Sequence, residues 1–292
     1  MKRRTYLSLT GGGIVTLASV GFCQDGSSKV RSINMPQEGG PPNLEDWGLV
    51  FEDTFDAGSL NNSNWNVGWG WGRSTTTSPM EVREDNIIIS DSQLRLRGTH
   101  DRETILSGVV NTKDNITFVP GSYIEAKLKF AKRVGFLNGF WTKPNNEAWP
   151  PEIDIVELIQ RNDSREETHR SIHNLHYSAS TEPGDSSTYQ KIGGDYEPDG
   201  DLTEEYHIYG VEWQDDYIIH YVDGQPIIKW VQETMLEAMR KGAPFYLLLS
   251  LNIDHLGEAD KSETWGEEFV CDWVRVWRDT SVKDSNKSNK SN

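Results

Sequence analysis

Cysteine is scarce in this chain, whose 292 residues include only Cys23 and Cys271. Cys23 lies in an N-terminal segment that has the features of an export signal, so the two residues are not expected to pair. The sequence therefore predicts no disulfide framework. Cys271 lies in a predicted strand and is expected to be a buried thiol. Stability must come from a hydrophobic core, and a chain of this length can bury one within a single large domain.

Positive charge is also in short supply, since 29 Lys and Arg residues stand against 45 Asp and Glu residues, for a net charge of −16. A protein that binds nucleic acid through its phosphates needs a positive surface, so this partner is excluded. The same balance argues against binding to anionic membranes. An acidic surface suits a neutral substrate or a high salt concentration, which screens the repulsion. We therefore predict a halophilic protein.

Long hydrophobic runs are absent, because the apolar segment 9–22 is too short and too rich in glycine to span a membrane. It follows a basic start, Met1-Lys2-Arg3-Arg4, and residues 1–23 are predicted to be an export signal. The pattern Arg3-Arg4-x-Tyr-Leu resembles a twin-arginine signal, which implies export of the folded protein and a secreted or extracellular location. Cys23 could carry a lipid anchor to the cell surface, although Phe22 directly before it fits a lipoprotein site poorly.

Helical periodicity is rare, and the chain consists mainly of short runs with strand character. Residues 121–131 alternate apolar and polar side chains, and Asp223-Gly224 between two such runs is typical of a hairpin. One short helix is predicted over 231–241, closed by Gly242 and Pro244. Regularly spaced strands with few helices predict an all-β protein built as a β-sandwich or jelly roll.

The composition also sets the expected domain boundaries. Residues 24–44 are rich in Gly, Ser, Pro and Gln and are predicted to be a linker. Residues 279–292 are rich in Ser, Asn and Lys and are predicted to be a disordered tail. Between them we expect one domain over 45–278, with no internal repeat.

Three carboxylates lie close together in the segment Pro151–Glu157: Glu152, Asp154 and Glu157. On a strand, Glu152 and Asp154 point to the same face. Glu157 joins them only if a β-bulge between Asp154 and Glu157 takes up one residue and resets the alternation. Bulges of this kind are over-represented beside active sites, so the pattern predicts a catalytic cluster on a bulged strand.

Two alternatives to a catalytic role remain open for this acidic cluster. Acidic side chains on a strand usually form a solvated face, but Ile153, Ile155 and Val156 place this strand inside a sheet. Clustered carboxylates there cost stability unless a ligand, a shared proton or a metal compensates. A calcium site is the second alternative. Metal-binding loops, however, tend to be rich in Gly, Asp and Asn rather than in Ile and Val.

The segment Glu152-Ile-Asp-Ile-Val-Glu157 resembles the ExDxxE signature of glycoside hydrolase family 16, in the bulged form found in laminarinases, agarases and carrageenases. Further segments agree with the family in order across about residues 45–278: Leu49–Asp56, Ser107–Lys113, Gly121–Lys129, Gly139–Trp141, Leu175–Tyr177, Tyr206–Trp213, Tyr221–Gly224 and Asp272–Trp277. A lone ExDxxE is a weak signal, whereas this ordered set is specific.

The resemblance implies a curved two-sheet jelly roll with a concave substrate cleft, and a retaining endo-β-glycanase that cleaves a polysaccharide. It implies that Glu152 is the nucleophile, Glu157 the general acid/base, and Asp154 the helper that shares a proton with its neighbours. No cofactor is required for this chemistry. We expect a monomer.

Substrate contacts are also implied by the resemblance. Trp141 matches a tryptophan of the family's cleft, and His176 matches a histidine on the strand after the acidic cluster. Trp69, Trp71 and Trp149 are further candidates, because Gly- or Pro-flanked loops leave aromatic rings exposed, although burial in the core is an equal alternative for each. His173 is expected on the same side as His176.

The family often carries a structural calcium ion on its convex side. Its ligands would correspond here to Glu52 or Asp53, a backbone carbonyl near Ser92, and Asp272. The alternative is that these residues are ordinary acidic side chains at a sheet edge.

The substrate polymer is left open by the sequence. A β-1,3- or mixed β-1,3/1,4-glucan is favoured, because acidic walls repel a sulfated polymer. The segment Leu137–Trp141 lacks a tryptophan and a proline found in many β-1,3-glucanases, which puts laminarin in doubt. The alternatives are a galactan hydrolase of agarase, carrageenase or porphyranase type, and a transglycosylase. A non-catalytic carbohydrate-binding jelly roll would lack one of the two glutamates, and both are present.

Overall fold

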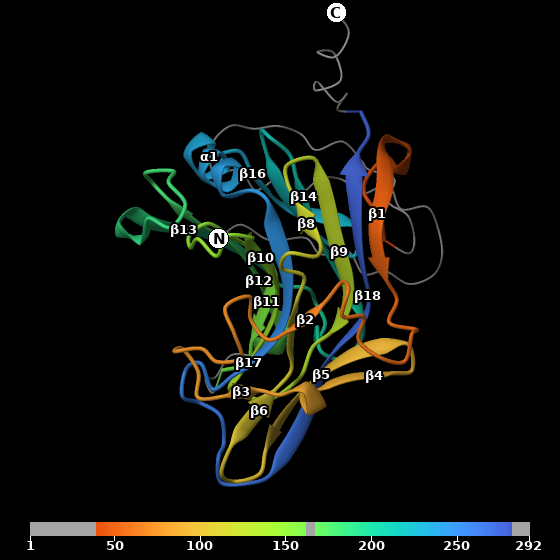
Figure 1. Cartoon of the computed structure of the whole chain (residues 1–292), viewed down its shortest axis with the longest axis vertical. Coiled ribbons are helices and arrows are strands. Elements are labelled where there is room, and N and C mark those ends of the chain that lie inside the picture. Colours follow the sequence, from red (N-terminus) through yellow and green to blue (C-terminus); the bar gives the residue numbers. More distant parts are fainter. Residues whose placement is uncertain (1–38, 162–166, 282–292) are drawn as a thin grey trace, which may run out of the picture. The chain divides into compact units, whose positions relative to one another are not determined.

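The computed structural model describes residues 39–161 and 167–281, which fold as two packed β-sheets (Figure 1). The first sheet has ten strands in the order β16-β15-β14-β9-β18-β5-β6-β3, with β1 paired to β18 and β4 paired to β5. Its strands are β1 (Trp47–Asp53), β3 (Glu81–Val82), β4 (Ile87–Ser90), β5 (Gln93–His100), β6 (Ile105–Ser107), β9 (Ser122–Lys129), β14 (His207–Trp213), β15 (Ile218–Val222), β16 (Gln225–Trp230) and β18 (Trp265–Asp279).

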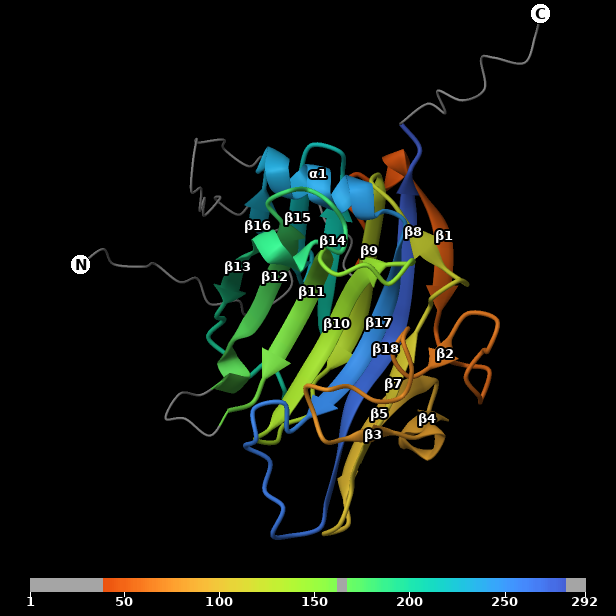
Figure 2. The same cartoon turned by 60° about the vertical axis from the view of Figure 1, so that its left-hand side comes forward.

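The second sheet has eight strands in the order β13-β12-β11-β10-β17-β7-β2, with β8 paired to β17. Its strands are β2 (Asn66–Val67), β7 (Val109–Asn111), β8 (Thr117–Phe118), β10 (Phe136–Pro144), β11 (Glu152–Ile159), β12 (Ser171–Ser178), β13 (Tyr189–Tyr196) and β17 (Phe245–Ile253). Figure 2 shows β11 inside this sheet, between β10 and β12. The strand that carries the three carboxylates is therefore supported on both edges.

Helical structure is limited, as the sequence predicts. One α-helix, α1 (Glu233–Gly242), lies close to the predicted range and ends before Pro244. Its apolar side chains Met235, Leu236 and Met239 are buried. Four 3₁₀ turns complete the helical elements of the described residues: η1 (Leu44–Asp46), η2 (Glu84–Asn86), η3 (Glu167–His169) and η4 (Ser186–Thr188).

The core lies between the two sheets. Along each strand, side chains that point into the core alternate with side chains that point outward. On β5, Leu94 and Leu96 are buried while Arg95 and Arg97 point outward. Large aromatic side chains complete the core, among them Trp65, Trp213, Phe136, Phe140 and Phe245. Full burial of such a side chain stabilises the fold by about 1.5–3 kcal/mol. The predicted all-β jelly-roll sandwich is confirmed.

The predicted linker 24–44 is too long at its C-terminal end. Gly39, Gly40 and Pro41 are buried, and the Gly40 backbone N–H donates to both carboxylate oxygens of Glu125 at 2.9 Å. Burial of this short apolar segment against β9 makes it part of the domain. At the C-terminal end of the domain, β18 continues to Asp279, which is the first residue of the predicted tail.

The predicted export signal, with Cys23, residues 24–38 of the predicted linker, and the predicted tail from residue 282 onward lie outside the described residues. Cys271 is buried with a free thiol, as predicted. None of the helices within residues 39–161 and 167–281 combines the length and apolar character needed to cross a bilayer.

Candidate active site

A β-bulge brings the three carboxylates of β11 to one face of the sheet. On the neighbouring strand β10, Gly139 lies opposite Glu157, and Trp141 lies opposite Asp154. Cross-strand partners share a face, and Gly139 and Trp141 are two residues apart on a strand. Asp154 and Glu157 therefore point the same way, which leaves Ile155 as the extra residue of the bulge. The bulge that the sequence predicts is confirmed.

The strand on the other side, β12, contributes two polar side chains to the same face. His176 lies opposite Glu152, and its Nε2 is 3.0 Å from Oδ2 of Asp154 and 3.6 Å from Oε1 of Glu152. Asn174 donates from Nδ2 to Oε2 of Glu157 at 2.8 Å. Asn174 is absent from the predicted site, although its position two residues before His176 places it on the same face.

The expectation that His173 shares the face of His176 is wrong. Residues three apart on a strand point to opposite faces. The ring of His173 accordingly lies in the interior with 0% exposure, where its Nδ1 is 2.6 Å from the carbonyl oxygen of Ile155.

Burial and mutual repulsion govern the protonation of the three acids. Burial is the main cause that raises the pKa of Glu152, and the charge of Asp154 adds to it. Burial and the charge of Glu157 raise the pKa of Asp154 well above the ordinary range. The three carboxyls therefore hold protons at a higher pH than free acids do and titrate together. One of them can stay protonated to donate a proton while another is ionised.

Several partners favour the charged form of Glu157 and oppose the effect of burial on its pKa. Burial raises its pKa, whereas the charge of His176, the hydrogen bond from Asn174 and the charge of Lys191 lower it. Burial lowers the pKa of His176, whereas the charges of Glu152 and Glu157 raise it. Its Nδ1 lies 2.7 Å from the Tyr189 hydroxyl, and its Nε2–H donates to Asp154.

Asn174→Ala is expected to shift the alkaline limb of the rate profile to higher pH. The Asn174 amide favours ionised Glu157, so its removal raises the pKa of that carboxyl further and keeps it protonated over a wider range. The check is kcat/KM measured across pH for both proteins. An alkaline limb that stays in place or moves to lower pH contradicts the role of Glu157 as the acid.

One aromatic cluster flanks the carboxylates on the side of β10. Trp141 donates from Nε1 to the Ser250 hydroxyl at 3.0 Å and lies 6.3 Å from Trp71, measured between ring centroids. Trp71 is 46% exposed and stacks on Trp69 at 5.4 Å. Trp69 itself is 5% exposed and supports Trp71 from beneath, so of its two predicted alternatives, substrate contact and burial in the core, the structure shows burial.

A second aromatic cluster flanks the carboxylates on the side of β12 and β13. Trp149 is 39% exposed and stacks on Tyr189 at 5.2 Å, and Tyr189 stacks on His176 at 5.8 Å. Trp71, Trp149 and Tyr189 are the large aromatic side chains exposed within the described residues, and all three lie beside the carboxylates. Nothing in the sequence marks Tyr189 as a residue of the site, because the loop before it carries no recognisable motif.

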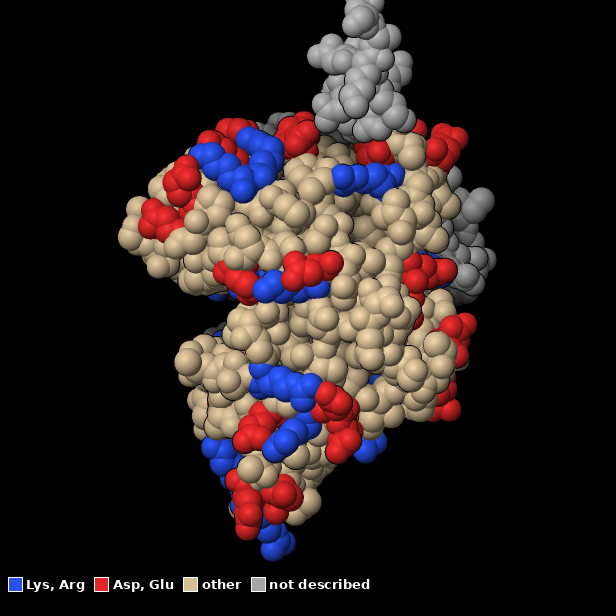
Figure 3. Space-filling model, in the orientation of Figure 1, with Lys and Arg blue, Asp and Glu red and all other residues tan. Residues whose placement is uncertain are grey.

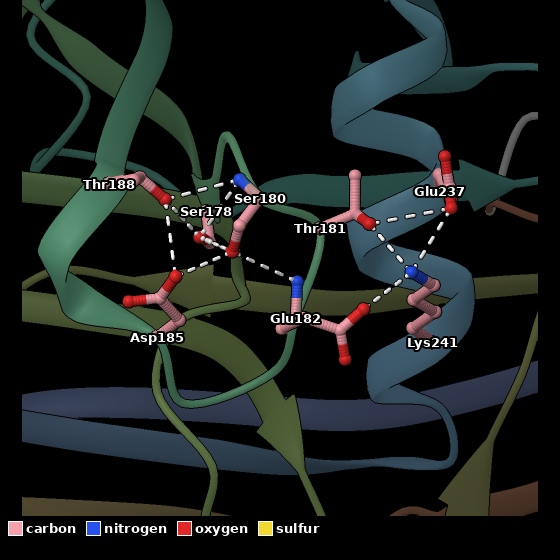
Figure 4. Close-up of polar contacts among 8 residues, drawn as sticks. All are labelled: Ser178, Ser180, Thr181, Glu182, Asp185, Thr188, Glu237 and Lys241. Carbon is pink, nitrogen blue, oxygen red and sulfur yellow. Dashed lines mark hydrogen bonds and ion pairs between the residues drawn. The ribbon is translucent and has the colours of Figure 1, made fainter.

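Polar contacts fix the loop that leads to Tyr189 (Figure 4). Lys241 on α1 donates to the Thr181 hydroxyl at 2.7 Å and to the Glu182 carboxylate at 2.8 Å. The Ser180 hydroxyl donates to Asp185 at 2.6 Å. The Gly184 backbone N–H donates to the carbonyl of the proline that follows Trp149, at 2.7 Å. These contacts hold the loop before Tyr189 to α1 and to the segment that carries Trp149.

The surface is hollowed between the two clusters. Figure 3 shows an indentation at its left edge. Figure 1 has the same orientation and identifies the two sides of this indentation. β13 lies above it, and the loop between β2 and β3, which is orange in Figure 1, lies below it. That loop carries Trp71, and β13 begins at Tyr189. An elongated ligand laid across the strands would meet one aromatic cluster, then the carboxylates, then the other.

The predicted calcium ligands each have partners within the protein. Glu52 accepts from Arg275 Nε at 2.7 Å, and Asp272 pairs with Lys127 Nζ at 2.9 Å. Asp53 accepts from the Phe55 backbone N–H at 2.9 Å and from Trp65 Nε1 at 2.8 Å. A calcium ion would have to replace these partners, so the site stays a prediction. Within the described part of the chain, the group of side chains with metal-ligand spacing is Glu152, Asp154 and His176. Its imidazole is not the hard oxygen ligand that calcium prefers.

Comparison with known proteins places this geometry in context. Residues 49–279 match the family described as the GH16 domain of beta-porphyranases A–D. A glucan endo-1,3-beta-glucosidase A1 of Niallia circulans is 24% identical over 289 residues, covering 85% of this chain and 40% of that protein. The chain thus spans less than half the length of this curated relative. A beta-glucanase of Rhodothermus marinus is 22% identical over 258 residues, covering 80% of this chain and 85% of that protein.

Solved structures agree on the fold. The catalytic domain of an endo-1,3-beta-glucanase (laminarinase) from Thermotoga petrophila superimposes with a TM-score of 0.65 and 24% identity. The match covers 80% of this chain and 98% of that domain. At this level of identity the likeness shows the fold, and the chemistry depends on the residues described above.

Proposed function

This chain belongs to glycoside hydrolase family 16 and acts on O-glycosyl bonds, and from that premise we propose that it is a retaining endo-β-glucanase. Its substrate would be a β-1,3- or mixed β-1,3/1,4-glucan, because the two relatives above are named as enzymes that act on glucans. The observation that carries the proposal is the bulged strand β11, which turns Glu152, Asp154 and Glu157 toward one hollow between two aromatic clusters.

The chemistry follows from two glutamates on one face. The Glu152 carboxylate attacks the anomeric carbon, while Glu157 donates its proton to the departing glycosidic oxygen. Glu157 then takes a proton from water, which attacks the same carbon and releases Glu152. Each displacement inverts the centre, so the product retains its configuration. Asp154, which accepts from His176 at 3.0 Å, holds a proton between the two glutamates or releases it as their charges change.

Endo cleavage is supported by the aromatic clusters on both sides of the acids. An indole ring stacks on the C–H face of a pyranose, so a chain held at Trp71 and at Trp149 can extend in both directions from the cleaved bond. This arrangement suits cleavage within a polymer rather than at its end.

Trp71→Ala is expected to raise KM for a polysaccharide by about tenfold, because loss of one stacked ring costs about 1.4 kcal/mol, with little change in kcat. The initial-rate dependence on polymer concentration measures this. Trp47→Ala is the matched control, because Trp47 packs against Tyr123 outside the cleft. An unchanged KM in Trp71→Ala would remove this ring from the binding surface.

A panel of polysaccharides tests the proposed substrate. Laminarin, lichenan, agarose, carrageenan and porphyran are each incubated with the chain, and new reducing ends are counted. The proposal expects release from laminarin or lichenan, with a rapid fall in viscosity that marks internal cleavage. Release of reducing ends from the galactans alone would refute the glucanase assignment while leaving the chemistry in place.

A sulfated galactan is the second candidate substrate, and two observations favour it. The matching family is described as porphyranases. In addition, Lys191 lies opposite His176 on β13, and the ion pairs of residues 39–161 and 167–281 do not include it. A lysine beside the acids can pair with a sulfate ester, despite a net charge of −16 for the chain. Porphyran in the panel, with and without its sulfate groups, decides between the candidates.

We also propose that the protein is exported and works at high salt. The paired arginines Arg3 and Arg4 support the first point, and the surplus of acidic residues supports the second. Lipid anchoring at Cys23 is an alternative to free secretion. Fractionation of cells that express the full chain, followed by mass spectrometry of the mature N-terminus, distinguishes the two.

Raising the salt concentration from about 0.1 M to molar levels is expected to raise both the melting temperature and kcat, because it screens repulsion among acidic side chains. Thermal unfolding and turnover at a series of KCl concentrations measure the effect. Values that do not change across the series contradict halophilic adaptation.

A further inference from the structure

The bulge interrupts the pairing of β11 with β12. The two strands pair at Ile153 and again at Glu157, and the residues between these positions have no register partner on β12. Two buried histidines contact the backbone there. His220 Nε2 lies 3.0 Å from the carbonyl oxygen of Asp154, and His173 Nδ1 lies 2.6 Å from that of Ile155.

Each ring is oriented by a second hydrogen bond on its other nitrogen. A carbonyl oxygen only accepts, so the nitrogen that faces the bulge must carry the proton. His173 Nε2 lies 3.0 Å from the Ser171 hydroxyl, which donates to it. His220 Nδ1 accepts from Trp230 Nε1 at 3.2 Å. Both rings are fully buried and neutral, because burial lowers their pKa values.

The two histidines reach the bulge from different sheets. His173 lies on β12, in the same sheet as β11, whereas His220 lies on β15, in the opposite sheet. Their rings contact each other at 5.3 Å between centroids. The carbonyls of two consecutive residues are thus held from two directions by one rigid pair, directly between Glu152 and Glu157.

We propose that His173 and His220 are positioning residues for catalysis, which lock the bulge in the geometry that aims Asp154 and Glu157 at the same point as Glu152. Neither ring touches the substrate face, so both act through the backbone of β11. This inference rests on the proposed glycosidase function. A displacement of about 1 Å between reacting groups can reduce the rate about a hundredfold.

Amide side chains test this role, because their donor can match or miss the histidine nitrogen. In His173→Asn, the amide nitrogen takes the place of Nδ1, and in His173→Gln it lies one bond further out. The order is reversed for His220, where Gln matches Nε2 and Asn falls short. We expect His173→Asn and His220→Gln to keep kcat within about threefold of wild type. The mismatched His173→Gln and His220→Asn should lose about 10- to 100-fold in kcat with KM nearly unchanged.

His100 is the matched control for a purely structural histidine. It is 3% exposed, its Nδ1 lies 2.8 Å from the Glu263 carbonyl, and it stacks on Trp265 at 5.4 Å. His100 and Trp265 lie on β5 and β18 of the other sheet. His100→Asn and His100→Gln should lower the melting temperature by amounts comparable to those of the test variants. Their kcat should stay within about threefold of wild type.

The assay uses the full chain and the polysaccharide that the wild-type protein hydrolyses fastest, with melting temperatures and kcat–pH profiles for each variant. Matched variants that retain kcat while mismatched ones lose it, at similar melting temperatures, support the proposal. Equal kcat in matched and mismatched variants, or an equal loss in the His100 variants, overturns it. If a mismatched variant does not fold, the matched variant of the other histidine still has to retain kcat. A wild-type chain that hydrolyses no polysaccharide refutes the proposed function instead.

Discussion

Glu152→Gln is expected to lower kcat by about 10⁴-fold or more, because an amide of the same size cannot attack the anomeric carbon. Its fold should survive and even gain stability. Burial raises the pKa of Glu152, so above the ordinary glutamate pKa its ionisation costs the folded state more than the unfolded state, which lowers the free energy of unfolding. The neutral amide removes that cost. Turnover and thermal unfolding at neutral pH measure both effects.

Reaction with azide shows whether a Glu152 variant has lost only its nucleophile or has lost activity for a general reason. In Glu152→Gly the space of the side chain admits a small anion, which can attack the anomeric carbon from the face that Glu152 leaves. A single displacement follows, and the product should be an α-glycosyl azide. A β-configured azide, or a Glu152→Gln variant with kcat within about tenfold of wild type, would assign the nucleophile elsewhere.

Glu157→Ala is expected to lower kcat on a polysaccharide by about 10²–10⁴-fold, the usual contribution of a general acid or base. The loss should depend on the leaving group. A dinitrophenyl β-glycoside departs without protonation, so the first displacement should proceed and the glycosyl-enzyme should accumulate. Rapid-mixing kinetics would then show a burst of dinitrophenol, followed by slow turnover. An equal loss on both substrates would contradict the role of Glu157 as the acid.

Azide again provides a distinguishing product, because it attacks the accumulated glycosyl-enzyme without a general base. Two displacements then yield a β-glycosyl azide, the opposite configuration from the Glu152→Gly reaction. Glu125→Gln is the matched control for both glutamates. Glu125 is fully buried, and burial raises its pKa to about 7, but it lies on β9 in the other sheet, where it accepts from the Gly40 backbone N–H. Its replacement should leave kcat unchanged.

The acidic cluster was open to prediction because local rules governed it. Alternation along a strand relates Glu152 to Asp154, and a bulge of one residue relates both to Glu157. Apolar neighbours such as Ile155 showed that the strand is buried, which argued against a solvated face for the three acids. Each of these inferences needs only the residues of one segment. The short helix and the Asp223-Gly224 hairpin were predictable for the same reason.

Errors arose where contacts between distant segments decide the outcome. Alternation along β12 is enough to place His173 in the interior, but nothing local shows that it meets His220 from the other sheet. Trp69 and Trp71 have similar glycine neighbours, yet packing buries one beneath the other. The predicted linker failed in the same way, because the acceptor for Gly40 is Glu125, 85 residues further along the chain.

The family, the two-sheet fold and the three acids could be predicted from the residues alone, because periodicity and a short motif depend on neighbouring residues. The folded structure was needed to show which aromatic rings are exposed, that Tyr189 and Asn174 join the site, and that two buried histidines contact the backbone of the bulge. These features depend on strands far apart in sequence meeting in one sheet or across the core. Side-chain burial and hydrogen-bond partners are therefore properties of the folded chain rather than of any segment.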